Sequence, residues 1–267
     1  MAGARAQQSG PRFACGPSVW IDPSDGPADA FEGEIRMWPA RLGAILAAGF
    51  LLLAPAPPAV ALDAAAFAAE NCATCHDLTG PAPGTFQGVL ERKAPDLFYA
   101  GSKFNRPWLV KWLQGPTIIR HAGVMFLNNI VNEDRKDRIR ETSVVPCSVK
   151  LSAGEAEAVS DYLMTLTDPA MAVGVVDSQQ STNERKAFRL FTKQLPCVGC
   201  HRIKFRKREL GGISAPDLTN AGERLNPDWI YARIENPQYW DPMTWMPKIE
   251  MSHRKREMLT LFLSSTK

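Results

Sequence analysis

The strongest constraint on this chain is a five-residue pattern that occurs twice along its 267 residues. Residues 72–76 and 197–201 both read C-x-x-C-H, the sequence that attaches c-type haem covalently. Two thiols three residues apart lie on about one helical turn, so both can reach the vinyl groups of a single porphyrin. The adjacent histidine then lies under the iron as its proximal ligand. The predicted attachment residues are Cys72, Cys75, Cys197 and Cys200, and the predicted proximal ligands are His76 and His201.

Two other uses of paired cysteines fit these motifs less well. A zinc ribbon has its C-x-x-C pairs about 15 to 20 residues apart, whereas the two pairs in this chain begin 125 residues apart. A thioredoxin-like dithiol lies in a βαβ unit, and no such alternating pattern surrounds either motif. Six cysteines are also too few for a disulfide scaffold in a chain of this length. We therefore expect two haem c groups as cofactors.

A segment near the N-terminus has the layout of a secretory signal peptide. Arg41 precedes an apolar run at 42–53, which is followed by prolines and by small residues at 59–61. This pattern predicts cleavage with a mature start near Leu62, and therefore a periplasmic protein. A retained anchor is the alternative, but twelve apolar residues fall short of the roughly 20 that a spanning helix needs. The predicted segments are a doubtful, acidic N-terminal extension at 1–36 and a cleavable signal peptide at 37–61.

A longer repeat emerges when the chain is aligned on itself at an offset of 121 residues. The sequence Ala-Pro-Asp-Leu at 94–97 falls on the same four residues at 215–218. Ten of the 32 ungapped positions in 94–125 are identical to their counterparts. Such self-similarity indicates duplicated structure as well as duplicated motifs.

The repeat also selects a candidate sixth ligand for each iron, because it aligns Met125 with Met246. Thioether sulfur is a soft ligand that favours ferrous iron and raises its potential. His121 and Met243 are the competitors, but neither is aligned with a residue that binds iron. The alternative role for either aligned methionine is to fill a gap in an apolar core. The predicted ligand pairs are His76 with Met125 and His201 with Met246.

With these motifs the chain resembles the class I c-type cytochromes, in particular the dihaem members built from two tandem domains. The resemblance covers nearly all of residues 62–267, including Trp-Met-Pro at 245–247. It implies an all-α fold in which each domain is wrapped around one covalently attached haem. It also implies that the carbonyls of Pro95 and Pro216 hydrogen-bond the proximal histidines and fix their orientation. One departure from the family pattern is that phenylalanine, not proline, follows the first predicted methionine ligand.

The coarse organisation follows from composition and capping signals. The expected domains are 62–167 and 182–267, joined by an irregular linker at 168–181. Trp108 and Trp229, which the repeat aligns, are expected to be core residues against the haems, with electron relay as the alternative. Expected helices lead into both motifs at 64–70 and 183–194, and others begin near Asn105, Ser152, Asn226 and Ser252.

The basic residues of the second half and the remaining cysteine each have more than one possible role. The net charge of +3 is too small to indicate nucleic-acid binding, although the second half is the basic one. Basic residues crowd 202–208, where they form either a solvated face or a surface that steers an acidic redox partner. Cys147 is the one cysteine of the predicted mature chain outside the motifs. It is an inert buried thiol, an intermolecular disulfide partner or a ligand to the first haem.

The sequence thus predicts a periplasmic dihaem cytochrome c that carries single electrons between redox partners and has no catalytic residues. One alternative is a haem enzyme, such as a peroxidase or a thiosulfate dehydrogenase, with the first haem as the reactive site. Another is a cytochrome subunit fixed in a larger respiratory or dehydrogenase complex. Contact with a membrane is expected only through such a partner complex or an uncleaved signal.

Overall fold

The computed structural model describes residues 62–140 and 144–267. The predicted extension at 1–36 and the predicted signal peptide at 37–61 lie outside these residues. The first half contains α1 (Ala64–Phe67), the π-helical turn η1 (Ala68–Cys72), α2 (Phe86–Glu91), α3 (Ala100–Lys103), α4 (Arg106–Gln114), the 3₁₀ turn η2 (Phe126–Asn128), β1 (Ile130–Glu133), β2 (Lys136–Ile139) and α5 (Ala153–Thr165). The second half contains α6 (Glu184–Arg189), the π-helical turn η3 (Leu190–Gln194), α7 (Cys197–Cys200), β3 (Ile203–Phe205), β4 (Arg208–Leu210), α8 (Ala221–Arg224), α9 (Pro227–Glu235) and α10 (His253–Ser264).

The prediction of an all-α fold is wrong, because two antiparallel two-stranded sheets accompany the helices. In the first hairpin, β1 pairs with β2 across the loop residues Asp134 and Arg135, whose φ angles are 52° and 60°. Positive φ at both loop residues is what a type I′ turn requires. In the second hairpin, β3 pairs with β4 across a loop in which Arg206 has a φ of 58°. Neither loop contains the glycine that marks such turns in a sequence, so the pattern of the chain did not reveal them.

The predicted helix starts are confirmed where the capping residues can be checked. Ser152 and Glu155 form a reciprocal capping box at the start of α5, with the Ser152 N–H donating to the Glu155 carboxylate over 2.9 Å. The Asn226 side chain accepts a hydrogen bond of 2.9 Å from the Asp228 N–H at the start of α9. These bonds satisfy backbone N–H groups that have no partner inside the helix.

The repeat in the sequence corresponds to a repeat in the structure. Helices α3, α4 and α5 have α8, α9 and α10 as their counterparts, and a π-helical turn leads into each C-x-x-C-H motif. The short helices α3 and α8 each contain a glycine, and at this residue each helix approaches the C-terminal end of a longer helix, α5 or α10. A Cβ atom on Gly101 would lie 2.7 Å from the carbonyl carbon of Met164, and one on Gly222 would lie 2.5 Å from that of Ser264. Both positions therefore require glycine for the same reason, close backbone contact.

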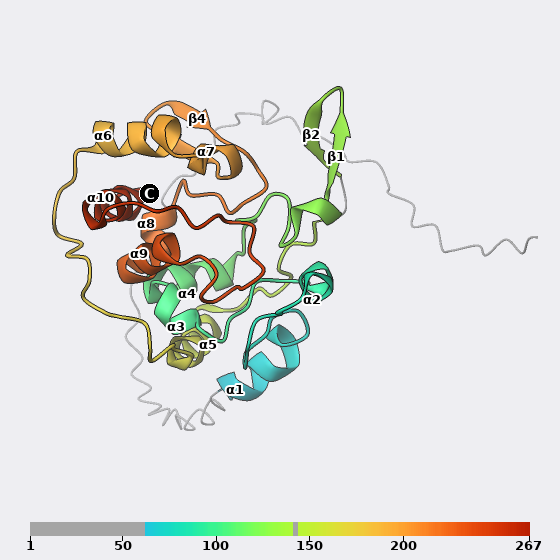
Figure 1. Cartoon of the computed structure of the whole chain (residues 1–267). Coiled ribbons are helices and arrows are strands. Elements are labelled where there is room, and N and C mark those ends of the chain that lie inside the picture. Colours follow the sequence, from blue (N-terminus) through green and yellow to red (C-terminus); the bar gives the residue numbers. More distant parts are fainter. Residues whose placement is uncertain (1–61, 141–143) are drawn as a thin grey trace, which may run out of the picture. The chain divides into compact units, whose positions relative to one another are not determined.

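The two halves meet where α3 and α4 lie beside α8 and α9 (Figure 1). The Asn105 N–H donates to the carbonyl oxygen of Arg224 over 3.0 Å, and the Asn226 N–H donates to that of Lys103 over 2.9 Å. The offset of 121 aligns Asn105 with Asn226 and Lys103 with Arg224. The halves thus exchange equivalent backbone hydrogen bonds across their contact.

Each half has its own cluster of buried apolar side chains. The one residue of the first half buried in the second cluster is Tyr99. Between the halves, residues 168–181 contain no helix or strand. This segment is attached to the second half, because Asp228 accepts hydrogen bonds from three successive backbone N–H groups at 174–176. None of the helices in the described part of the chain is long and apolar enough to cross a membrane.

Candidate haem-binding sites

The second C-x-x-C-H motif forms α7 and ends at His201, its C-cap residue. The Nδ1 atom of His201 lies 2.8 Å from the carbonyl oxygen of Pro216. Because a carbonyl oxygen can only accept, Nδ1 carries the proton and Nε2 has a free lone pair. Such a bond fixes both the tautomer and the ring orientation of a metal-binding histidine.

The first motif repeats this arrangement. Cys72 is the last residue of η1, and His76 follows in a turn with its Nδ1 atom 2.6 Å from the carbonyl oxygen of Pro95. The pKa of His201 is lowered to about 4 by burial, partly opposed by the Pro216 bond. The pKa of His76 is also lowered by burial. Both rings are therefore neutral near pH 7, the form in which histidine binds a metal.

The motif thiols differ from those of a redox dithiol. Burial raises the pKa of the Cys72 thiol and raises that of Cys197 to about 11. A catalytic C-x-x-C pair instead needs a thiol whose pKa is lowered. The described residues also contain no group of three or more His, Cys, Asp or Glu side chains placed to hold a metal ion. A haem needs only two protein ligands on its iron, so a single His and a single Met suffice at each site.

A cavity lies beside the second motif and joins its predicted residues. It is partly open to solvent. Cys197, His201 and Met246 all line it. Its other lining residues are apolar, namely Phe191, Leu218, Ile234, Pro247, Ile249, Met251, Leu259 and Leu263. The lining of this cavity is largely apolar, and one thiol, one neutral imidazole and one thioether lie in its wall, which is the set of groups that a haem attached through the motif would need.

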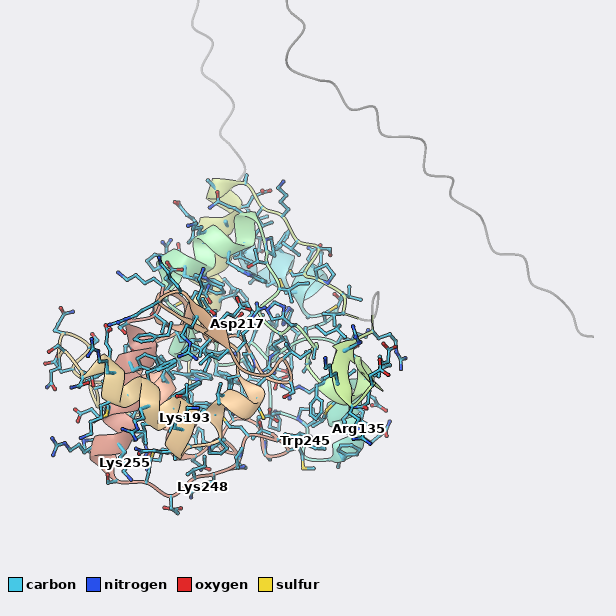
Figure 2. All side chains as sticks on the ribbon, turned by 90° about the horizontal axis from the view of Figure 1, so that it is seen from above. Arg135, Lys193, Asp217, Trp245, Lys248 and Lys255 are labelled. Carbon is cyan, nitrogen blue, oxygen red and sulfur yellow. The ribbon has the colours of Figure 1, made fainter. Side chains whose placement is uncertain are left out.

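Met125, the predicted methionine ligand of the first site, is buried, but no contact described in residues 62–140 and 144–267 brings it to His76. Met125 precedes η2 and has 3% of its surface exposed. Met125 and Met246 lie on loops whose neighbouring aromatic side chains touch. Phe126 contacts Trp245 edge to face, with ring centroids 5.3 Å apart. Trp245 is 56% exposed and lies toward the rim of the described part in Figure 2.

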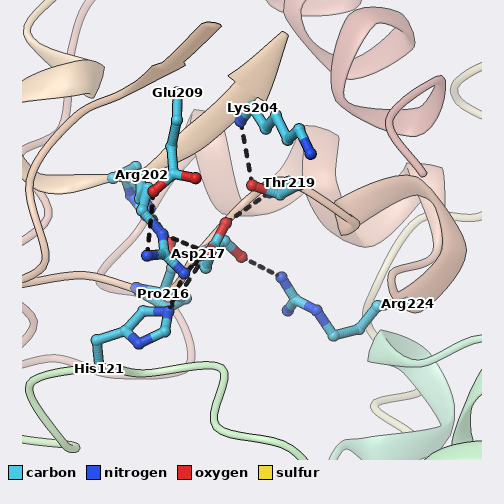
Figure 3. Close-up of polar contacts among 9 residues, drawn as sticks. His121, Arg202, Lys204, Glu209, Pro216, Asp217, Thr219 and Arg224 are labelled. Carbon is cyan, nitrogen blue, oxygen red and sulfur yellow. Dashed lines mark hydrogen bonds and ion pairs between the residues drawn. The ribbon is translucent and has the colours of Figure 1, made fainter. Parts of the chain in front are cut away.

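The competitor ligand His121 is engaged elsewhere. Its Nε2 atom lies 2.5 Å from Nη2 of Arg202 and 3.4 Å from Oδ2 of Asp217 (Figure 3). Arg202 also pairs with Asp217 over 2.6 Å, and the Thr219 N–H donates to the same carboxylate over 2.8 Å. His121 therefore links the loop of the first half to the residues next to His201 and Pro216.

The two aligned tryptophans have different surroundings. Trp229 is buried, with 9% exposure, and stacks on Trp240 at a centroid distance of 5.9 Å. Trp108 is half-buried and stacks between Phe104 and Trp112. Neither lines the cavity beside His201. The prediction that both are packing residues against haem stays a prediction.

The basic segment at 202–208 forms the β3–β4 hairpin. Arg202 is half-buried and pairs with Glu209 and Asp217, whereas the other four basic residues are exposed. These four are Lys204, Arg206, Lys207 and Arg208. They are close to the second motif along the chain, so their charge lies near the proposed second haem.

Cys147 is half-buried. The pKa of the Cys72 thiol is raised mainly by burial and further by the neighbouring Cys147 thiol. The structure therefore places this cysteine near the first motif.

Sequence reasoning did not detect a group of buried and half-buried cations where the two halves meet. We call it the cation cluster, and it consists of Arg92, Lys103, Arg120, Arg224 and Arg233. Lys103 has 8% of its surface exposed and Arg224 has 3%. One signal was available, because the repeat aligns Lys103 with Arg224 and so places a basic residue at the same position in both halves.

No family model, curated protein or solved structure matches this chain.

Proposed function

We propose that this chain is a dihaem c-type cytochrome of the periplasm that carries single electrons between redox partner proteins. The observation that carries this proposal is the same arrangement of side chains built twice. In each half a π-helical turn leads to a C-x-x-C-H motif, and the motif histidine donates from Nδ1 to a proline carbonyl. Two such histidines, each with Nε2 free, suit two irons better than they suit hydrolytic or dithiol chemistry.

The residues of the chain have distinct roles in this proposal. Cys72 and Cys75 would hold one haem, and Cys197 and Cys200 the other. The haem iron supplies the one-electron chemistry when bound. The carbonyls of Pro95 and Pro216 keep the imidazoles in one tautomer, and Met125 and Met246 are the proposed distal ligands. The apolar side chains around the second cavity would shield a bound haem from water, which would favour the less charged ferrous state.

A count of haem per chain tests the proposal directly. The full chain would be expressed with its own N-terminus in a host that attaches haem c, and haem would be quantified as the alkaline pyridine adduct. We expect two haems per chain, and one for a Cys72→Ser/Cys75→Ser variant. Cys147→Ser is the matched control, since it removes a thiol near the first motif without changing the motif, and it should retain two. A wild-type chain without covalent haem would refute the proposal.

The proximity of Cys147 to Cys72 supports one second candidate, a haem enzyme with the first haem as its reactive site. Thiolate ligation of the first iron in place of Met125 would lower its potential sharply. The ferric spectrum separates the candidates through its weak long-wavelength band from Met sulfur to iron. Two equivalents per chain indicate an electron carrier with His–Met ligation at both irons. One equivalent that disappears in Met246→Ala would identify the first haem as the reactive one.

A further inference from the structure

Each predicted methionine ligand ends a loop that reaches across to the other half. We call residues 117–125 and 238–246 the methionine loops, and the offset of 121 aligns them position by position. Neither loop contains a helix or strand. We call residues 95–96 and 216–217 the proline straps, because the proline carbonyl of each accepts a hydrogen bond from a proximal histidine. Contacts between the halves join each methionine loop to the region of the opposite strap.

The first methionine loop is held by the second strap and its neighbour. The Asp217 N–H donates to the carbonyl oxygen of Ile119 over 2.8 Å. Two positions further along the loop, Nε2 of His121 lies 2.5 Å from Nη2 of Arg202 (Figure 3). Because a guanidinium can only donate, the imidazole accepts this bond. Arg202 directly follows His201, so the first loop is attached beside the proximal ligand of the second site.

The second methionine loop is held by the first strap through different residues. Arg92 pairs with Asp96 of the strap, and its Nη1 atom lies 3.3 Å from Oδ1 of Asp241 in the loop. None of these three side chains is more than 14% exposed. Beside the ion pair, the ring of Trp240 contacts that of Tyr99 from the first half, with centroids 5.7 Å apart. This link is therefore largely screened from water.

The two links are related by the internal repeat, although their chemistry differs. Ile119 and Trp240 are aligned at the offset of 121, and both contact the opposite half. Asp96 and Asp217 are aligned in the same way. Each of these carboxylates binds an arginine that also contacts the opposite loop. The same pattern of attachment thus exists in both directions.

Bonds within each half hold the ends of the loops near the methionines. The Asn129 side chain donates to the carbonyl oxygen of Met125 over 3.3 Å, and the Gln238 side chain donates to that of Met246 over 3.1 Å. These bonds fix the backbone at one end of each loop, whereas the contacts between the halves fix its middle. A ligand must be held within about half an ångström of its productive position. Loosening the middle of a loop should therefore weaken its methionine.

We propose that the contacts between the halves position the distal ligands, with Arg202 of the second half holding the loop of Met125 and Arg92 of the first half holding the loop of Met246. This inference rests on the proposed function, and it adds that the ligation of each haem is controlled from the opposite half. Damage beside one strap then weakens the methionine of the other site more than that of its own.

The test measures how firmly each methionine holds ferric iron in the holoprotein. Imidazole is added as a competing ligand, and loss of the long-wavelength band from Met sulfur to iron gives a midpoint concentration. A Met246→Ala background leaves only the band of the first site, and a Met125→Ala background leaves only that of the second. Because iron partitions between methionine and imidazole, a tenfold weaker methionine lowers the midpoint tenfold.

The two arginines should act on opposite sites. We expect Arg202→Gln to lower the first-site midpoint about tenfold, as loss of one hydrogen bond to a charged group does, and to leave the second-site midpoint within about twofold. Arg92→Gln should lower the second-site midpoint and leave the first. Arg189→Gln and Lys111→Gln are the matched controls, because each removes an exposed cation from one half, and both midpoints should stay unchanged.

His121→Leu provides a second variant if Arg202→Gln does not bind two haems. The side-chain contacts described for His121 are with Arg202 and Asp217 of the second half, so its loss should lower the first-site midpoint alone. The inference is overturned if the midpoints are unchanged, if both fall together, or if each arginine affects only the site of its own half. A two-haem protein without any methionine band also overturns it. A chain without covalent haem would refute the proposed function as well, so haem content distinguishes the two failures.

Discussion

Because α8 approaches α10 closely, we predict that a single added methyl group lowers the stability of the fold strongly. A Cβ atom at position 222 would lie 2.5 Å from the carbonyl carbon of Ser264 and nearer still to its oxygen, whereas real Cβ contacts are almost never below 3.0 Å. The obstacle is backbone, so a helix must move by about 1 Å to clear the carbonyl oxygen of Ser264. Overpacking of this kind costs typically 1–3 kcal/mol. We expect the free energy of unfolding of Gly222→Ala to be about 3 kcal/mol lower than that of wild type. Its melting temperature should be about 6–12 °C lower, given roughly 2–4 °C per kcal/mol for a chain of this size.

The same chain offers an equivalent site and a control. Gly101→Ala meets the Met164 backbone in the corresponding way in the first half, so it should cost a similar amount. Gly154→Ala in α5 meets nothing within 4 Å, and alanine is favoured over glycine in a helix by about 1 kcal/mol. It should therefore raise the melting temperature slightly. Thermal unfolding of the holoproteins followed by far-UV circular dichroism measures all three. A Gly222→Ala variant within about 0.5 kcal/mol of wild type would refute the packing argument.

Three further predictions concern ligation, pH and charge. Met246→Ala should remove one equivalent of the Met-to-iron band and leave the other, as measured on the ferric protein; loss of both bands would show that the sites are not independent. Burial raises the pKa of Asp217, but bonds from Thr219 and Arg202 outweigh it and hold the pKa below the ordinary value of 3.8. The ionised carboxylate therefore stabilises the fold above pH 3.8, and this stabilisation is lost as the pH falls through the lowered pKa. The difference in melting temperature between wild type and Asp217→Asn should be full at pH 7 and should vanish in strong acid. Replacing the four exposed cations of the β3–β4 hairpin by glutamine should slow the reduction of hexacyanoferrate(III) by the ferrous protein about tenfold at low salt, whereas Lys255→Gln should leave the rate unchanged. A rate difference that persists near 1 M salt would contradict a steering role, because the Debye length is then only about 3 Å.

The sequence was informative wherever a local rule acts on a few adjacent residues. The capping pattern at Ser152 and the Asn-Pro-Asp start at Asn226 correctly predicted where α5 and α9 begin. Duplication also paired the helices of the two halves correctly. The hairpins escaped detection because Asp134 and Arg135 in the first loop and Arg206 in the second adopt left-handed backbone without being glycine. An all-α prediction could not include them.

The candidate sites show the same division between local and long-range information. The motif fixes the thiols and the histidine by spacing alone, and the repeat led to the methionines. The cation cluster is the opposite case, because arginine and lysine are usually exposed and nothing in the order of residues shows that several are buried together. Lys103 and Arg120 come together with Arg224 and Arg233 only through long-range folding. His121 likewise meets Arg202 across 81 positions of sequence.

The exchanged bonds of Asn105 and Asn226 have the geometry of an isologous interface contained within one chain. In such an interface, the same surface serves both partners, so two copies of one ancestral half could associate through it without any new contact. Covalent fusion then replaces a concentration-dependent association by a local effective concentration, commonly millimolar for a short linker. The two halves then need only an affinity that is sufficient at this effective concentration, so the surface between them can be small and polar. Its centre is therefore available for charged groups. The buried cations between the halves occupy that position.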